Sequence, residues 1–183
     1  MVRLRRGTTA LLVIDVQERL LPVIDAAAEI AKRIGVAIEG ALVTGVPVLV
    51  TEQYPKGLGR TVPSLTRHLK EITPFEKLSF SCCGVEGVDR ALEKLAPASV
   101  LIAGIETHVC VMQTCLDLIE RGTTPVLLAD CAGSRHEHDH LYALERLRNA
   151  GAVISTVEST LFEITGTAGT DEFKQISRLV KPL

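Results

Sequence analysis

Short apolar runs alternate with stretches of helical periodicity along the whole chain. The run from Val100 to Ala103 has no polar break, which is typical of a strand that is buried on both faces. It stops at Gly104, and a helical pattern begins after a few polar residues. The chain repeats this strand–turn–helix unit, which predicts a parallel sheet whose crossover connections contain the helices.

The same pattern sets the expected boundaries. Strands are predicted at 9–15, 47–51, 72–77, 99–103, 125–129 and 152–155, and helices at 26–44, 85–95, 109–121, 138–149 and 171–180, with a short helical piece near Leu161. The stretch from Glu52 to Thr61 contains two glycines and one proline, which predicts a loop. Because no linker, repeat or low-complexity segment interrupts this order, we expect a single α/β domain over residues 1–183, with helices on both faces of the sheet.

Composition narrows the class of protein. Hydrophobic residues make up 46% of the 183 residues and there is no Trp, as in aliphatic α/β cores. The formal net charge of −2 offers no electrostatic case for a nucleic acid or an anionic membrane as partner. The five cysteines are an odd number without C-x-x-C spacing, which favours reduced thiols over disulfides or a zinc site. A short apolar run after Arg6 ends in Asp15 without a cleavage site, so we expect a soluble, cytoplasmic protein.

Three polar residues fall at the predicted carboxyl edge of the sheet, where open α/β sheets bind ligands. Asp15 ends the first strand, Lys77 follows the extended segment, and Cys110 opens a helix. A helix start favours an anion, so we expect a lowered pKa for the Cys110 thiol. Cys110 would be the nucleophile, Lys77 would favour the anionic sulfur, and Asp15 would move the proton.

Each of these residues also has a plainer interpretation. Cys110 is then a small core residue, Asp15 a turn or cap residue, and Lys77 a solvated side chain. Their shared location at one edge supports the functional interpretation. In that case the backbone N–H groups of Val109 and Cys110 would form the oxyanion hole of an acyl-transfer reaction.

Three segments of the chain resemble the signature segments of the isochorismatase-like cysteine hydrolases: LLVIDVQERL, FEKLSFSC and AGIETHVCV. Two longer stretches, TEQYPKGLGRTVPSL and ALERLRNAGAVISTVESTLFEITGTAGTDEFKQISRLVK, resemble the subgroup of isochorismatase-domain-containing hydrolases. The resemblance covers nearly the whole chain. It implies a three-layer fold with a six-stranded parallel sheet of Rossmann-type order, the Asp15, Lys77 and Cys110 triad, and a cis peptide bond between Ile105 and Glu106 beside the oxyanion hole.

Two differences between this chain and other members of the superfamily refine the expected chemistry. Metal-dependent nicotinamidases of this superfamily carry a D-x-H pair and a further His after the second strand, whereas this chain has Glu52-Gln53-Tyr54 there, so we expect no metal and no cofactor. Isochorismatase itself lacks the cysteine and cleaves a vinyl ether. The presence of Cys110 points instead to an amide, carbamoyl or ester bond and a thioester intermediate.

Residues that flank the triad segments are candidates for substrate contact, since small-molecule sites combine apolar walls with a few polar anchors. They are Tyr54, Phe80 and His108, with structural packing as the alternative for Phe80. Gln53 and Glu106 are candidates to orient an amide, or else are solvated or support the site from outside. The His136–His140 run invites a metal interpretation. Because the run stands at the start of a polar helix, solvent exposure of these side chains is favoured instead.

Two rival functions keep the same fold. One is an interaction or scaffold protein that uses the pocket only for recognition. The other is a thiol redox sensor that pairs Cys110 with Cys82 or Cys83. A nucleotide-binding protein is disfavoured because no G-x-G-x-x-G or Walker sequence follows a strand. The expected partners are a small-molecule substrate and further copies of the chain, since the resemblance suggests that the C-terminal helices contribute to a homo-oligomer of two or more subunits.

Overall fold

The computed structural model describes residues 3–69 and 72–183. Its six strands form one parallel sheet in the order β3-β2-β1-β4-β5-β6. The strands are β1 (Thr9–Ile14), β2 (Val48–Gln53), β3 (Phe75–Lys77), β4 (Ser99–Ile105), β5 (Thr124–Gly133) and β6 (Val153–Ser155). The fold is the expected three-layer α/β architecture.

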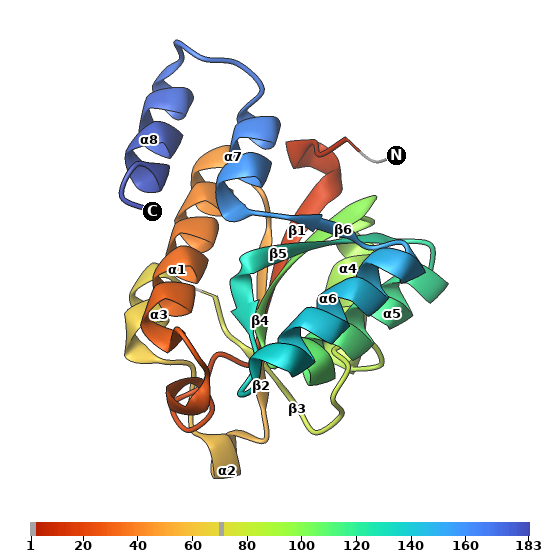
Figure 1. The fold of residues 1–183 in the computed structure, drawn as a ribbon. Helices are drawn as coiled ribbons and strands as arrows, with labels where there is room; N and C mark the ends of the chain where they lie inside the picture. The colour runs from red at the N-terminus through yellow and green to blue at the C-terminus, as the bar shows by residue number, and fades with distance from the viewer. Residues whose placement is uncertain (1–2, 70–71) are drawn as a thin grey trace.

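Helices cover both faces of this sheet (Figure 1). One face carries α1 (Ala27–Thr44), α3 (Pro63–Leu69), α7 (Val157–Thr165) and α8 (Asp171–Val180), and the other carries α4 (Glu86–Leu95), α5 (Met112–Glu120) and α6 (Glu137–Ala150). Short helical turns complete the chain: η1 (Arg6–Thr8), η2 (Leu21–Val23), α2 (Pro55–Leu58) and the π-turn η3 (Thr107–Val111).

The alternation of side chains along β1 explains the two cores. Leu11 and Val13 point into the core under α1, α7 and α8, whereas Leu12 and Ile14 point into the core under α4, α5 and α6. All four side chains are fully buried, so the strand reads in the sequence as an unbroken apolar run.

The direction in which successive strands are added to the sheet reverses between β1 and β4. The first three strands build outward from β1 in one direction, and the last three build outward from β4 in the other. The carboxyl ends of these two central strands therefore form the topological switch point, where open α/β sheets bind ligands. Asp15 follows β1 directly, and η3 with Cys110 follows β4.

Several elements differ from the expectation. In the segment predicted as a loop over 52–61, the first two residues belong to β2. The same segment contains α2, because Pro55 takes the first helical position, where proline needs no N–H partner. Helix α3 is not marked by the pattern. Strand β5 continues past Ala129 to Gly133, because its pairing with β4 resumes after a register shift. Of the strand predicted over 72–77, only Phe75–Lys77 pair as a strand.

Candidate functional site

Asp15 and Lys77 meet inside the protein beneath the switch point. Lys77 Nζ lies 2.6 Å from Asp15 Oδ2, and neither side chain is exposed. Thr51 on β2, between the two strands that lead to them, donates a hydrogen bond from Oγ1 to Asp15 Oδ1 at 2.8 Å. The plainer interpretation of Lys77 as a solvated lysine is therefore wrong. A buried ion pair stabilises little by itself, so its presence beneath a ligand-binding edge points to chemistry.

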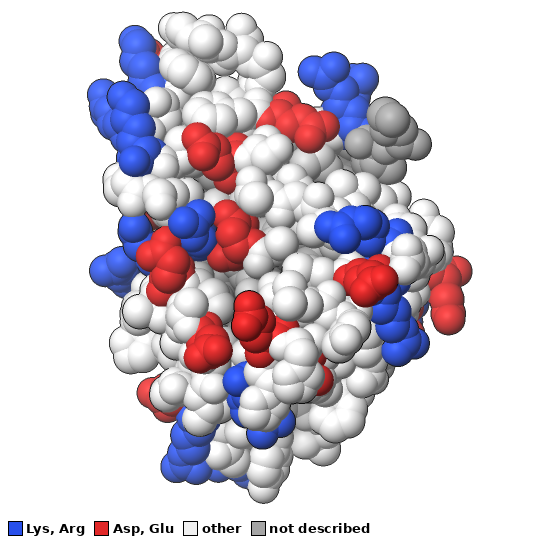
Figure 2. All heavy atoms as spheres, viewed as in Figure 1, with Lys and Arg blue, Asp and Glu red and all other residues white. Residues whose placement is uncertain are grey.

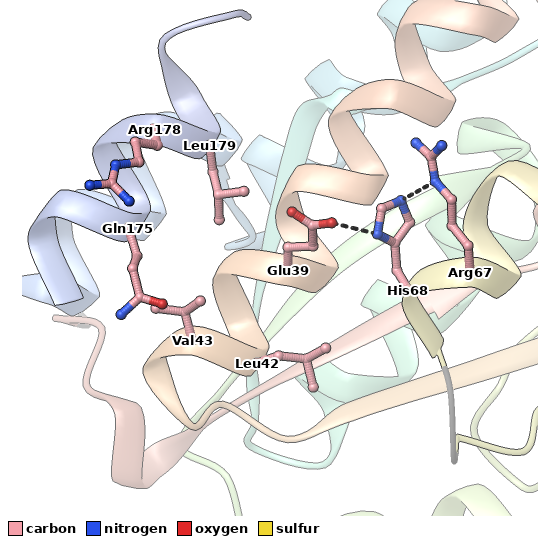
Figure 3. Close-up of a pocket in the computed structure, with 8 residues that line it drawn as sticks. All are labelled: Glu39, Leu42, Val43, Arg67, His68, Gln175, Arg178 and Leu179. Atoms are coloured by element: carbon pink, nitrogen blue, oxygen red, sulfur yellow. Dashed lines mark hydrogen bonds and ion pairs between the residues drawn. The ribbon is translucent and has the colours of Figure 1, made fainter. Parts of the chain in front are cut away.

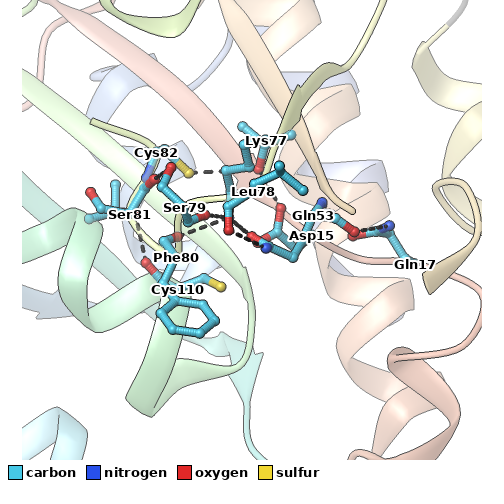
Figure 4. A network of polar contacts seen from close by, with 12 residues as sticks. Asp15, Gln17, Gln53, Lys77, Leu78, Ser79, Phe80, Ser81, Cys82 and Cys110 are labelled. Atoms are coloured by element: carbon cyan, nitrogen blue, oxygen red, sulfur yellow. Dashed lines mark hydrogen bonds and ion pairs between the residues drawn. The ribbon is translucent and has the colours of Figure 1, made fainter. Parts of the chain in front are cut away.

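Cys110 completes this group from the other side (Figure 4). Its side chain is buried, with 5% of the residue exposed, in the π-turn that follows β4. The Asp15 and Lys77 charges both act on its pKa, which places the thiol beside the ion pair. The three residues predicted from the sequence are thus brought together by three different segments of the chain.

The expected lowering of the Cys110 pKa is wrong. Burial and then the Asp15 charge raise the pKa of the thiol to about 12, although Lys77 acts in the opposite direction. The helix start does not prevail because a buried thiolate loses its hydration and faces a carboxylate. The resting sulfur is consequently a thiol at neutral pH, and any nucleophilic reaction needs a base at the moment of attack.

Asp15 has the properties of such a base. Burial raises the pKa of its carboxyl group above the usual range, and the charge of Lys77 opposes that rise. A carboxylate whose pKa is raised in this way holds a proton more readily than an exposed aspartate does. Its φ of 55° turns the chain sharply away from β1 directly after Ile14.

The turn that carries Cys110 is fixed by three consecutive residues. Buried Glu106 accepts hydrogen bonds from Arg135 N at 2.9 Å and Arg135 Nε at 3.1 Å. The Thr107 hydroxyl is 2.9 Å from His140 Nδ1, and His108 Nδ1 is 2.9 Å from Ser134 Oγ. Ser134 and Arg135 lie in the segment that leads from β5 into α6, and His140 lies in the first turn of α6. No local sequence pattern predicts these pairings, because they join segments about 30 residues apart.

Two backbone features of this turn are visible in the structure. The peptide bond between Ile105 and Glu106 is cis, and Ile105 is fully buried at the end of β4. The Val109 N–H donates to the Glu106 carbonyl oxygen at 3.1 Å. Closing the turn thus engages the hydrogen that was expected to bind an oxyanion, and the use of the Val109 N–H in an oxyanion hole stays a prediction.

The remaining candidates divide by exposure. Tyr54 and Phe80 are about half exposed, at 50% and 54%, on the loops that follow β2 and β3. Gln53 is half-buried, and its side-chain amide is bonded to Lys77 Nζ and to the Leu78 carbonyl oxygen. The interpretation of Gln53 as a substrate anchor is therefore not supported by its contacts. Three residues that contact the site went unmarked in the sequence. They are Thr51, Gln17, whose Nε2 donates to the Gln53 carbonyl oxygen, and Thr114, whose hydroxyl donates to the Cys110 carbonyl oxygen at 2.7 Å.

No group of three or more metal-ligating side chains forms among the described residues. In the His136–His140 run, the rings of His136 and His138 stack on each other at 5.6 Å, while His140 turns toward Thr107. All five cysteines are free and buried.

A separate cavity of about 420 Å³ lies between α1, α3 and α8 (Figure 3). Its lining includes Glu39, which pairs with His68 Nδ1 at 2.7 Å, and Arg67, whose Nε donates to His68 Nε2. Asp15, Lys77 and Cys110 do not line it.

Comparison with known proteins identifies the family. The family model for the isochorismatase domain matches residues 9–159. The chain belongs to the isochorismatase family. The matched region runs from the first residue of β1 into α7, so it includes all six strands and every residue of the proposed triad.

Individual relatives extend over nearly the whole chain. The secreted isochorismatase effector Isc1 of Phytophthora sojae is 39% identical over 98% of this chain and 87% of its own length. Isochorismatase domain-containing protein 1 of Salmo salar is 37% identical over 96% of this chain, which spans only 62% of that protein. A structure of MAR1 ribonuclease from Caenorhabditis elegans superposes with a TM-score of 0.92, at 38% identity, over 98% of this chain and 92% of that one.

Among residues 3–69 and 72–183, no helix combines the length and hydropathy needed to cross a bilayer. One relative is named as secreted, so the cytoplasmic location stays a prediction.

Proposed function

We propose that this protein is a metal-independent cysteine hydrolase, built as one domain, that cleaves a small amide, carbamoyl or ester bond through a thioester intermediate. Its membership of a hydrolase family supports the general class. The observation that carries the finer proposal is the buried group formed by Asp15, Lys77 and Cys110 at the switch point of the sheet.

The geometry suggests the order of events. Asp15 takes the proton of the Cys110 thiol while the sulfur attacks the carbonyl carbon of the substrate, forming a C–S bond and an oxyanion. Collapse of this adduct breaks the bond to the leaving nitrogen or oxygen, which receives the proton from Asp15. Asp15 then takes a proton from water, whose oxygen attacks the thioester, and returns it to the sulfur as the C–S bond breaks. The acid is released and the thiol is restored.

Lys77 supplies the positive charge that these reaction steps need. Its ammonium group lies beside Asp15 throughout and balances the negative charge on the carboxylate or the sulfur. Because the Val109 N–H is occupied, we assign the oxyanion to the Cys110 N–H, within the turn that Glu106 and Arg135 hold in place.

The decisive experiment is a turnover screen of primary amides, carbamoyl compounds and esters. On any substrate found, Cys110→Ala should lower kcat by about 10³-fold or more, since it removes the nucleophile. Cys83→Ser, at a buried cysteine in the loop after β3, is the matched control and should retain turnover. Mass spectrometry of rapidly quenched reactions should show the acyl group on Cys110. Full turnover by Cys110→Ala would exclude the proposal.

The rival redox function is less well supported. Cys82 is fully buried, and burial raises its pKa to about 12, so both it and Cys110 are protonated at neutral pH. Thiols in this state react slowly with oxidants.

We propose a small molecule and further copies of this chain as partners. The C. elegans relative is named a ribonuclease. For this chain, a net charge of −2 and the interleaving of basic and acidic side chains on the face in Figure 2 argue against a nucleic acid. Exposed apolar side chains, such as Leu78 at 76% and Tyr142 at 70%, support a homo-oligomer.

A further inference from the structure

Gln17 lies fully buried in the loop that follows β1, against the segment that follows β2. Its Oε1 accepts the Gln53 N–H at 2.7 Å, and its Nε2 donates to the carbonyl oxygens of Gln53 at 3.0 Å and Gly59 at 2.7 Å. The amide of Gln17 thus holds both backbone groups of Gln53. This fixes the backbone from which the Gln53 side chain extends.

The Gln53 side chain reaches from the end of β2 to the end of β3 (Figure 4). Its Nε2 donates to the Leu78 carbonyl oxygen at 2.7 Å, and its Oε1 accepts from Lys77 Nζ at 2.7 Å. The bond from Nε2 orients the amide, so that its oxygen and not its nitrogen faces the ammonium group.

Lys77 Nζ has three hydrogens and three hydrogen-bond acceptors. These acceptors are Gln53 Oε1, the Phe80 carbonyl oxygen at 2.8 Å and the Ser79 carbonyl oxygen at 3.1 Å. Asp15 Oδ2 is as near, at 2.6 Å, and forms the ion pair with Nζ without being one of these three acceptors. Among the described residues, Asp15 Oδ2 accepts no hydrogen bond, whereas Oδ1 accepts one from Thr51.

We propose that Gln53, anchored by Gln17, is a positioning residue that takes one hydrogen of Lys77 and so keeps Asp15 Oδ2 open to receive the proton of Cys110. This inference rests on the proposed function, in which Asp15 is the base. It gives Gln53 a role in the reaction without contact with the substrate.

Through Lys77, the Gln53 side chain affects the pKa of Asp15. The titratable groups facing Asp15 are Lys77 on β3, Cys82 on the loop after β3, and Cys110 on η3. If Gln53 loses its oxygen, one Lys77 N–H is released and can turn toward Asp15 Oδ2. A hydrogen bond to the carboxylate favours its charged form, so the pKa of Asp15 falls and it becomes a weaker base.

The test measures the rate of Cys110 alkylation by iodoacetamide against pH, by peptide mass spectrometry, and needs no known substrate. In the unaltered protein the rate should rise as Asp15 loses its proton, because the ionised carboxylate can then accept the thiol proton. Gln53→Met should move this inflection down by about one pH unit and lower the plateau above it. Gln53→Glu should move the inflection up, because a second carboxylate beside Asp15 opposes its ionisation.

Gln53→Asn is the second variant, since it keeps an amide but is one methylene too short to hold Lys77, and it should behave as Gln53→Met does. Gln175→Met, at an exposed glutamine on α8, is the control and should leave the profile unchanged. An unmoved inflection in Gln53→Met and Gln53→Asn, with folding intact by circular dichroism, would overturn the inference.

Asp15→Asn separates this failure from failure of the proposed function. If the inflection persists in Asp15→Asn, Asp15 is not the base and the proposed function fails. If it disappears in Asp15→Asn but does not move in the Gln53 variants, only the positioning role of Gln53 is wrong.

Discussion

At Asp15, burial and hydrogen bonding act on one carboxylate in opposite directions. Burial raises the pKa of Asp15 most strongly, while the Lys77 charge and the hydrogen bond from Thr51 lower it. The resulting base is stronger than an exposed aspartate yet still ionisable, which suits proton transfer from a thiol. The sequence identified the residue through its position at the end of a strand, but its buried partners determine its basicity.

The Thr51 hydroxyl provides a test at this scale. Thr51→Val keeps the shape of the side chain but removes the hydrogen bond to Asp15 Oδ1, which favours the charged form. The pKa of Asp15 should therefore rise, and the acid limb of turnover should move to higher pH. Leaving Oδ1 without a partner should also cost about 1–3 kcal/mol in the free energy of unfolding.

Thr51→Ser is the matched control, because it retains the hydroxyl, and its acid limb should stay in place. An identical pH profile for Thr51→Val and the unaltered protein would contradict the role given to this hydrogen bond.

Strands β1 and β4 approach each other closely where the site begins. Gly104 pairs with Ile14, and a Cβ atom at Gly104 would lie only 2.1 Å from the Ile14 carbonyl oxygen. Its φ of 129° is also one that other residues rarely adopt. Since Asp15 follows Ile14 and Cys110 follows β4, the glycine sets how near the two segments can come.

Gly104→Ala should therefore lower the free energy of unfolding by about 2–6 kcal/mol, since overpacking and backbone strain cost about 1–3 kcal/mol each. Gly122→Ala is the control: its φ of 78° is also positive, but no atom lies within 4 Å of the added Cβ. Urea unfolding of both variants separates strain from steric clash. Equal losses of stability in the two would contradict a close approach at Gly104.

At the scale of the whole molecule, exposed apolar side chains remain on several elements. They include Val23, Leu78, Phe80, Leu141 and Tyr142, each more than half exposed. Single exposed apolar residues are normal, but a surface with many of them is suited to contact with a further copy of the chain.

Light scattering coupled to size-exclusion chromatography at micromolar concentration should therefore give a mass that is a whole multiple, two or higher, of the 19.7 kDa chain. A salt titration serves as the control, because association through apolar surface should survive ionic strength that screens charges. A mass of 19.7 kDa under these conditions would contradict the homo-oligomer.

The sequence by itself determined the alternation of strands and helices and the boundaries of helix α8 at Asp171–Val180. It also determined the position of Asp15, Lys77 and Cys110 at the carboxyl edge of the sheet. These follow from local patterns, because apolar periodicity and the end of a strand are visible within a few residues. The tertiary structure decided four other features: helix α2, the contacts of Gln53, the hydrogen bond that engages the Val109 N–H, and the raised pKa of Cys110. Each of the last three depends on the atoms that surround a group after folding. Those atoms come from segments far apart in the chain, so no local pattern records them.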